Sequence, residues 1–103
     1  ISSGYNIAGP EVEAVLMAHE AVLECAVIGI PDPDRGHIVQ AHVVVHEGTE
    51  PSDATAAMLQ EHVKATIAPY KYPRSVVFTA ALPKTETGKV QRYVLRNVGK
   101  GTS

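Results

Sequence analysis

The sequence predicts an α+β domain in which a small, mostly three-stranded sheet is covered by helices. Short runs of β-branched residues alternate along the chain with longer stretches whose apolar residues recur every three or four positions. The expected order is helix, strand, strand, helix, strand, helix, which fits the α+β class. With 103 residues the chain is large enough for one hydrophobic core and too small for two. We therefore expect a single compact domain over residues 1–103.

The first helix is predicted to begin at Pro10. Residues 2–7 indicate a turn centred on the permissive Gly4, and proline is well suited to the first helical position. Glu11 and Glu13 then lie in the first turn, where the positive end of the helix dipole favours carboxylates. The apolar face of this helix contains Val12, Val15 and Leu16.

Two strands are expected next. Residues 22–30 form a short, β-branched apolar run that is typical of a buried strand, and the Pro-, Asp- and Gly-rich residues 31–36 form a turn. Residues 38–46 predict a second strand with one wholly apolar face. Its other face includes Gln40, His42 and His46, so we expect one buried face and one wetter face.

His42 and His46 project from the same side of the predicted second strand. A metal site there is conceivable, but no cysteine or carboxylate cluster joins the two histidines. Since a zinc site normally takes three or four protein ligands, we expect no metal site.

A second helix is predicted over residues 53–67, with Ser52 as its N-cap and Pro69 as its stop. Gln60 and Lys64 lie on its polar face. A third strand is expected at residues 75–79 and a last helix at residues 90–97. The apolar stripe of the second helix comprises Ala56, Leu59, Val63 and Ile67.

Composition excludes several classes of protein. The formal net charge of −2 argues against a nucleic-acid binder, and no apolar run approaches the length of a membrane span. The single cysteine, Cys25, has no partner for an internal disulfide and indicates a reducing compartment, so a cytoplasmic location is expected. The chain opens on Ile1 rather than methionine, and we interpret it as part of a longer protein.

A basic loop at residues 82–92 is the best candidate for a functional site. Gly88 permits a sharp turn beside Lys89, and apolar residues at helical spacing after the loop fix its far end. This arrangement can aim a positive charge at an anion bound elsewhere. Most basic loops are nevertheless solvated, so the pattern alone leaves an ordinary surface loop open.

The run Pro83-Lys84-Thr85-x-Thr87-Gly88-Lys89-x-x-Arg92 resembles the C-terminal signature of the adenylate-forming superfamily. This superfamily includes acyl- and aryl-CoA synthetases, luciferases and the adenylation domains of peptide synthetases. The C-terminal signature of this superfamily lies in a small lid domain. Further segments of that domain are resembled, in the expected order, by residues 3–13, 27–36 and 67–73. Residues 2–13 look most like benzoate and 2-aminobenzoate–CoA ligases. The large N-terminal domain of that family is absent from this chain.

The resemblance implies an AMP-forming acid–CoA ligase. Such an enzyme uses ATP and Mg²⁺ to activate a carboxylic acid as an acyl-adenylate, and then transfers the acyl group to coenzyme A. The implied partners are the acid, ATP, coenzyme A and the chain's own N-terminal domain. Some acetate-type relatives carry an arginine where Asn6 stands, and its absence here favours an aromatic or medium-chain acid. The isolated 103 residues are expected to be inactive.

The resemblance also assigns individual residues. Lys89 matches the catalytic lysine of the family. Gly4, flanked by Ser3 and Tyr5, would line the tunnel for the pantetheine arm of coenzyme A, and Lys64 would meet its phosphates. The alternative for Lys64 is a solvated position on the polar face of the helix, with no ligand contact.

The flanking Lys84 is expected to be a solvated supporting charge, Arg92 a structural residue near the base of the loop, and Lys71 a weaker candidate for coenzyme A. Two other functions stay open. One is the lid of a peptide-synthetase adenylation domain, and the other is a free-standing module that binds a phosphorylated ligand or a protein.

Overall fold

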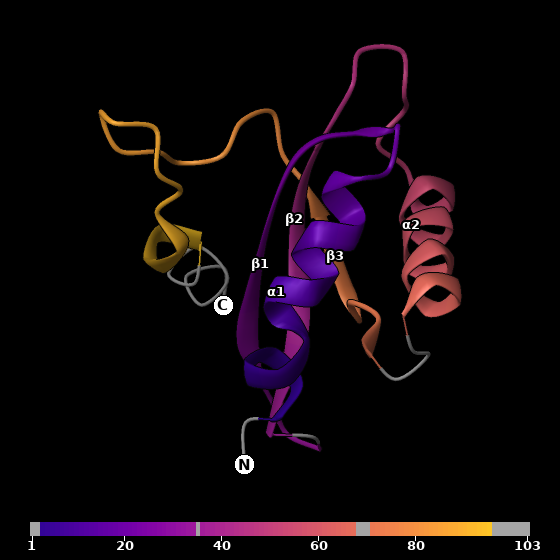
Figure 1. Ribbon diagram of the computed structural model, residues 1–103, viewed down its shortest axis with the longest axis vertical. Helices are drawn as coiled ribbons and strands as arrows, with labels where there is room; N and C mark the ends of the chain where they lie inside the picture. The colour runs from indigo at the N-terminus through magenta and orange to yellow at the C-terminus, as the bar shows by residue number, and fades with distance from the viewer. Residues whose placement is uncertain (1–2, 35, 68–70, 96–103) are drawn as a thin grey trace.

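The computed structural model describes residues 3–34, 36–67 and 71–95. It contains α1 (Ser3–Met17), β1 (Val22–Asp32), β2 (Gly36–Val45), α2 (Asp53–Thr66) and β3 (Ser75–Phe78), followed by a helical turn at residues 92–95. The predicted α+β class and the predicted order of elements are confirmed. Figure 1 shows α1 lying across the sheet and α2 beside it.

The sheet has the strand order β1-β2-β3 and is mixed. β1 and β2 form an antiparallel hairpin whose register runs from Val22 opposite Val45 to Asp32 opposite Gly36. β2 and β3 are parallel, and α2 lies in the connection between them, as a parallel pair requires a crossover. β2 is therefore the central strand, and β1 and β3 are the two edges.

Two apolar clusters lie on the two faces of this sheet. The larger one joins the buried faces of α1 and α2 to β1 and β2. The smaller one joins β1 and β2 to the segment after β3. The larger cluster consists of Val12, Leu16, Val22, Cys25, Val27, Val39, Ala41, Val43, Leu59 and Val63. The smaller cluster consists of Ala26, Ile28, Val44, Leu82 and Leu95.

The prediction of a wetter face on β2 is wrong, because the smaller cluster covers that face as well. His42 is only 4% exposed and Gln40 only 8%. The His42 Nε2–H donates to Gln40 Oε1 at 2.8 Å, and Gln40 Nε2 donates to Ser75 Oγ at 3.0 Å. Burial lowers the pKa of His42, so the neutral ring is favoured. This hydrogen-bonded chain explains how polar side chains are accommodated in the interior.

The predicted start of the first helix is also wrong. α1 begins at Ser3 rather than Pro10, so Pro10 lies inside the helix and the expected turn around Gly4 is helical. Proline costs the helix one backbone hydrogen bond without ending it here. Glu11 and Glu13 consequently lie beyond the first turn, and tertiary ion pairs engage them instead of the helix dipole. β1 also extends through Pro31 and Asp32, so the turn between the strands is shorter than expected.

α2 follows the sequence prediction closely. Ser52 is its N-cap, with Oγ accepting from the Thr55 N–H at 3.3 Å. Leu59 and Val63 are fully buried. The helix ends at Thr66, and the expected stop at Pro69 lies outside the described residues. No helix in the described ranges has both the length and the apolar character to cross a membrane.

Candidate functional site

Residues 84–90 form a tight hairpin. Lys84 and Val90 make an antiparallel bridge. Inside it, the Thr85 N–H donates to Lys89 O at 2.9 Å, and the Gly88 N–H donates to Thr85 O at 2.9 Å. Gly88 has a φ of +90°, which a side chain rarely permits, so the predicted turn beside Lys89 is confirmed. The backbone of Lys89 is thus fixed within an ordered turn.

The threonine side chains of the signature reinforce this turn. The Lys89 N–H donates to Thr85 Oγ1 at 3.1 Å. The hydroxyl groups of Thr85 and Thr87 lie 3.0 Å apart and share a further hydrogen bond. Short hydroxyl side chains at these positions therefore stabilise the backbone that carries Lys89.

The smaller apolar cluster anchors both ends of the hairpin. Leu82 precedes it and Leu95 follows it, and both are buried against β1 and β2. Val90 packs against the same cluster, and the Gln91 N–H donates to Pro83 O at 2.9 Å across the base. The hairpin is therefore fixed at its base and exposed at its tip, where it extends away from the sheet in Figure 1.

Two ion pairs flank the base of the hairpin. Lys84 Nζ lies 2.5 Å from Glu24 Oε1, so Lys84 is paired rather than simply solvated as expected. Arg92 Nη2 lies 2.6 Å from Glu13 Oε2, which confirms the expected pairing of Arg92 near the base. These contacts tie the hairpin to β1 on one side and to α1 on the other.

Lys89 lies between the two flanking cations and differs from both. Its side chain is exposed, and no ion pair or hydrogen bond of its ammonium group occurs among the described residues. An ammonium group on a fixed backbone, with no anion paired to it in the part of the chain that the structure describes, is available to an anion outside the domain.

Ser3, Gly4 and Tyr5 lie in the first turn of α1, and the structure describes their backbone but not their side chains. Figure 1 shows the start of α1 at the bottom of the domain and the hairpin at the top left. The structure does not bring these residues together with Lys89. The residues that the resemblance assigns to the thiol therefore lie on a separate surface from the lysine.

Lys64 belongs to a third region, near the C-terminal end of α2. Its Nζ lies 3.1 Å from Glu61 Oε2 and 4.3 Å from the centre of the Tyr72 ring. The Arg74 guanidinium lies 4.9 Å from the same ring, and its Nη1 donates to the Tyr72 hydroxyl at 3.0 Å. The sequence analysis assigned no role to Arg74; the available signal was that it closely follows Lys71 and Tyr72 in a short basic and aromatic segment.

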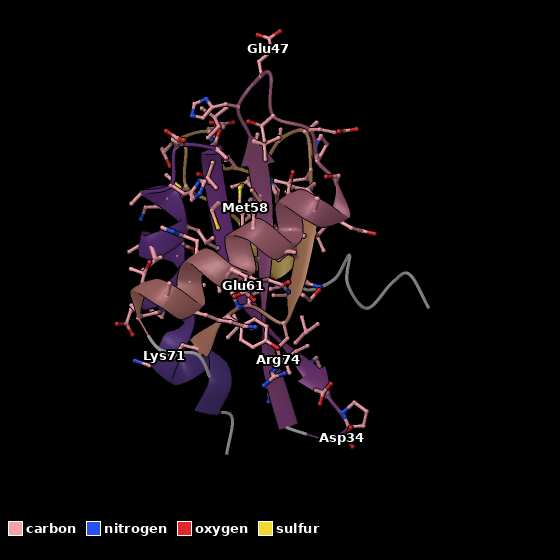
Figure 2. All side chains as sticks on the ribbon, turned by 90° about the vertical axis from the view of Figure 1, so that its right-hand side faces the viewer. Asp34, Glu47, Met58, Glu61, Lys71 and Arg74 are labelled. Carbon is pink, nitrogen blue, oxygen red and sulfur yellow. The ribbon has the colours of Figure 1, made fainter. Side chains whose placement is uncertain are left out.

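Lys71 completes this region and is paired with Glu11 at 2.7 Å. We call Lys64, Lys71 and Arg74 the basic surface, and Figure 2 shows Lys71 beside the end of α2 and Arg74 below the helix. Each of these cations contacts a carboxylate or a ring of the same chain.

The remaining reactive side chains form no further site. Among residues 3–34, 36–67 and 71–95 there is no group of three or more His, Cys, Asp or Glu side chains that could hold a metal ion. Cys25 is buried, and burial, with a smaller contribution from Glu13, raises its pKa to about 12. A thiol that stays neutral at physiological pH is a poor nucleophile.

Comparison with known sequences identifies the family to which this fold and its hairpin belong. The chain belongs to the AMP-binding enzyme C-terminal domain family, whose sequence profile matches residues 11–89. This match includes the whole sheet, α2 and the hairpin as far as Lys89.

Curated relatives are ligases. An uncharacterised acyl–CoA ligase, YtcI of Bacillus subtilis (strain 168), is 51% identical over 96 residues, covering 93% of this chain and 18% of the relative. The mitochondrial acyl-coenzyme A synthetase ACSM4 of Rattus norvegicus is 52% identical over 99 residues, covering 94% of this chain and 17% of the relative. The chain thus spans less than a fifth of the length of these relatives.

Solved structures agree with this family. The acyl-CoA synthetase of Brucella canis superposes with a TM-score of 0.87 at 42% identity, over 91% of this chain and 17% of that one. A benzoate CoA ligase from Burkholderia xenovorans LB400 superposes with a TM-score of 0.78 at 48% identity, over 85% of this chain and 18% of that one. The predicted resemblance to the lid domain, and to benzoate ligases, is confirmed.

Proposed function

We propose that this chain is the C-terminal lid domain of an AMP-forming acid–CoA ligase. Family membership and relatives that are acyl-CoA ligases support the proposal. The observation that carries it is the exposed Lys89 ammonium group, which has no partner among the described residues and is carried by an ordered hairpin. A larger N-terminal domain outside this chain supplies the pockets for ATP and the acid.

The first half-reaction joins two anions. An oxygen of the carboxylate attacks the α-phosphorus of ATP, the bond to the bridging oxygen breaks, and pyrophosphate leaves with its electron pair. Lys89 offsets the repulsion between carboxylate and phosphate, and it stabilises the charge that moves onto the leaving pyrophosphate. An ammonium group fixed in place does this without reorganising during the reaction. Mg²⁺ accompanies ATP, and since the described residues contain no metal-ligand cluster, we assign it to the N-terminal domain.

In the second half-reaction the thiol of coenzyme A attacks the carbonyl carbon of the adenylate, and AMP leaves. We assign Ser3, Gly4 and Tyr5 to this step, where a side chain at position 4 would obstruct the pantetheine arm. Their separation from Lys89 fits a lid that presents a different surface in each half-reaction. Lys64 is assigned to the phosphates of coenzyme A. To bind them, Lys64 must leave its ion pair with Glu61.

The acid is proposed to be aromatic or medium-chain. The supporting observations are Asn6 in place of an arginine and the 48% identity to a structure described as a benzoate CoA ligase. Initial rates of the full-length enzyme with benzoate, hexanoate and acetate test this assignment, and a preference for acetate would contradict it. The cytoplasmic location stays a prediction, because several relatives, the ACSM4 synthetase of Rattus norvegicus among them, are described as mitochondrial.

The decisive experiment compares two lysines of the same hairpin in the full-length ligase. We expect Lys89→Ala to lower acid-dependent ATP–pyrophosphate exchange about 100- to 1000-fold, as is typical when one electrostatic donor is lost. Thioester formation from supplied acyl-adenylate should be largely retained. Lys84→Ala, which removes a paired cation, is the matched control and should have a much smaller effect. Equal loss of both half-reactions in Lys89→Ala would contradict the role.

The thiol assignment has its own test. Gly4→Leu should impair thioester formation while sparing pyrophosphate exchange. Unchanged thioester formation would contradict the assignment of Gly4 to the tunnel.

Coenzyme A is preferred over a carrier protein as the source of the thiol because the relatives are acyl-CoA ligases and synthetases. The 103-residue chain alone should turn over nothing. Tight binding of ATP by this chain, measured by calorimetry, would instead favour the free-standing binding module.

A further inference from the structure

Glu13 makes three contacts that join three separate parts of the domain. Its carboxylate accepts from Arg92 Nη2 at 2.7 Å through Oε1 and at 2.6 Å through Oε2. Oε2 also accepts from the Val27 N–H at 2.9 Å. Glu13 lies on α1, Val27 on the outer edge of β1, and Arg92 directly after the lysine hairpin. We call Glu13 and Arg92 the clasp.

The clasp restrains the hairpin in a way that the apolar anchors do not. Leu82 and Leu95 hold the base through non-directional packing, which resists separation but permits rocking. The internal hydrogen bonds of the hairpin make it move as one unit. The two charge-assisted hydrogen bonds that one guanidinium nitrogen donates to both carboxylate oxygens are directional, so they restrain the angle at which that unit stands.

Arg92 is three residues beyond Lys89, so a rotation at Arg92 is transmitted directly to the ammonium group. We propose that the clasp is the positioning element that sets where the Lys89 ammonium group stands, and that it couples the hairpin to α1. This inference rests on the proposed role of Lys89. Because the first turn of α1 holds the residues assigned to the thiol, the clasp also makes the two working surfaces of the lid rotate as one body.

Steady-state kinetics of the full-length ligase tests the clasp. Glu13→Gln is the sharpest variant, because a glutamine oxygen still accepts from the Val27 N–H while the charge opposite Arg92 is removed. We expect a fall of about tenfold or more in kcat for ATP–pyrophosphate exchange, since a misplacement of about 1 Å can cost up to 100-fold. The KM values for ATP and acid, and thioester formation from supplied adenylate, should stay nearly unchanged.

Three further variants separate positioning from simple stabilisation. Arg92→Gln should reproduce the loss, and Arg92→Lys should recover part of it. Glu13→Gln combined with Arg92→Gln should be no worse than either alone, because both remove the same contact. Lys84→Gln breaks the other ion pair at the base and is the matched control, with a smaller effect on kcat.

A second measurement keeps the inference testable if a variant loses activity by misfolding. Hydrogen–deuterium exchange of the full-length protein should become faster in the peptide covering residues 84–91, and it should not change in the peptide covering α2. Faster exchange throughout the domain, or equal loss of both half-reactions, would overturn the positioning role.

The outcomes also separate this inference from the proposed function. If Lys89→Ala abolishes pyrophosphate exchange while Glu13→Gln and Arg92→Gln leave it normal, the clasp is overturned and the function of Lys89 stands. If Lys89→Ala leaves exchange normal, the proposed function fails, and the clasp falls with it.

Discussion

Two groups of cations lie on opposite sides of the sheet, and they differ in what holds them. On the basic surface, Lys64 contacts Glu61 and the Tyr72 ring, and Lys71 is paired with Glu11. In the hairpin, the cations on either side of Lys89 are paired, while Lys89 has no partner within the described ranges. Figure 1 shows α2 on the right of the domain and the hairpin at the far left.

The difference shows how a small domain keeps one charge available. Paired cations hold a frame together, and their charge is already neutralised by neighbours. A cation that serves an external anion must be excluded from such pairing and still be held in place. The hairpin meets both conditions because its backbone, rather than the Lys89 side chain, makes the restraining contacts. On the basic surface, a ligand has to compete with Glu61 or Tyr72.

The largest expected effects are on stability, and they compare the two apolar clusters that lie beneath the two regions. Leu59 is fully buried below α2 in the larger cluster, and Leu82 is 6% exposed below the hairpin in the smaller one. Leu59→Ala should lower the free energy of unfolding by about 2–5 kcal/mol. Leu82→Ala should lower it by about 2 kcal/mol, the lower end of this range. Urea denaturation of the 103-residue chain measures both. A larger loss for Leu82→Ala would contradict the ranking of the two clusters.

A smaller effect is expected at two glycines with matched geometry. Gly88 in the hairpin and Gly48 between β2 and α2 have φ values of +90° and +98°, and a Cβ at either position meets nothing within 4 Å. Alanine should therefore cost only backbone strain, about 1–2 kcal/mol at each site. Pyrophosphate exchange should fall with Gly88→Ala and stay normal with Gly48→Ala. Loss of pyrophosphate exchange in both variants would show that this reaction does not depend specifically on the turn at Gly88.

The thiol of Cys25 reports on the clasp, since Glu13 raises and Arg92 lowers its pKa after the main effect of burial. The pKa rises from 9.0 to about 12 on folding, so the unfolded thiol ionises first. This contribution to stability is complete below pH 9 and is lost as the pH rises towards 12. The slope is roughly 1 kcal/mol per pH unit. Cys25→Ala should show a shallower decline between these values, and equal slopes would contradict the assignment.

The smallest effect concerns Lys64. Its pair with Glu61 is exposed, so Glu61→Gln should change the free energy of unfolding by only about 0.3–0.5 kcal/mol. The same variant should lower the KM for coenzyme A, because Lys64 no longer has to leave Glu61. Lys64→Ala should raise that KM without changing pyrophosphate exchange. If neither variant alters the KM for coenzyme A, Lys64 has a structural role and does not bind coenzyme A.

The sequence was sufficient wherever a local pattern determines the outcome. The N-cap at Ser52, the buried stripe of α2 and the turn at Gly88 depend on residues a few positions apart, and the structure confirms all three. The order of elements follows from the same kind of pattern. Lys89 itself was found through its signature motif, and its exposed side chain agrees with an outward-facing role.

The missed features depend on residues far apart in the chain. Alternation along β2 could not reveal that Leu82 and Leu95 cover its second face, so His42 and Gln40 were expected to be wetter than they are. Glu13 was interpreted from its distance to a presumed helix start, whereas its partner Arg92 is 79 residues away. No single-sequence pattern encodes such a contact.

The contact between Glu13 and Val27 has a further consequence for solubility. β1 is an 11-residue edge strand, and an unpaired edge of that length offers a template on which another chain can add a strand. A carboxylate and a guanidinium placed over the middle of this edge occupy one of its donors and block an incoming backbone with charge. The opposite edge, β3, is only four residues long and offers little length for pairing. We therefore expect the carboxylate of Glu13 to disfavour intermolecular sheet formation along β1.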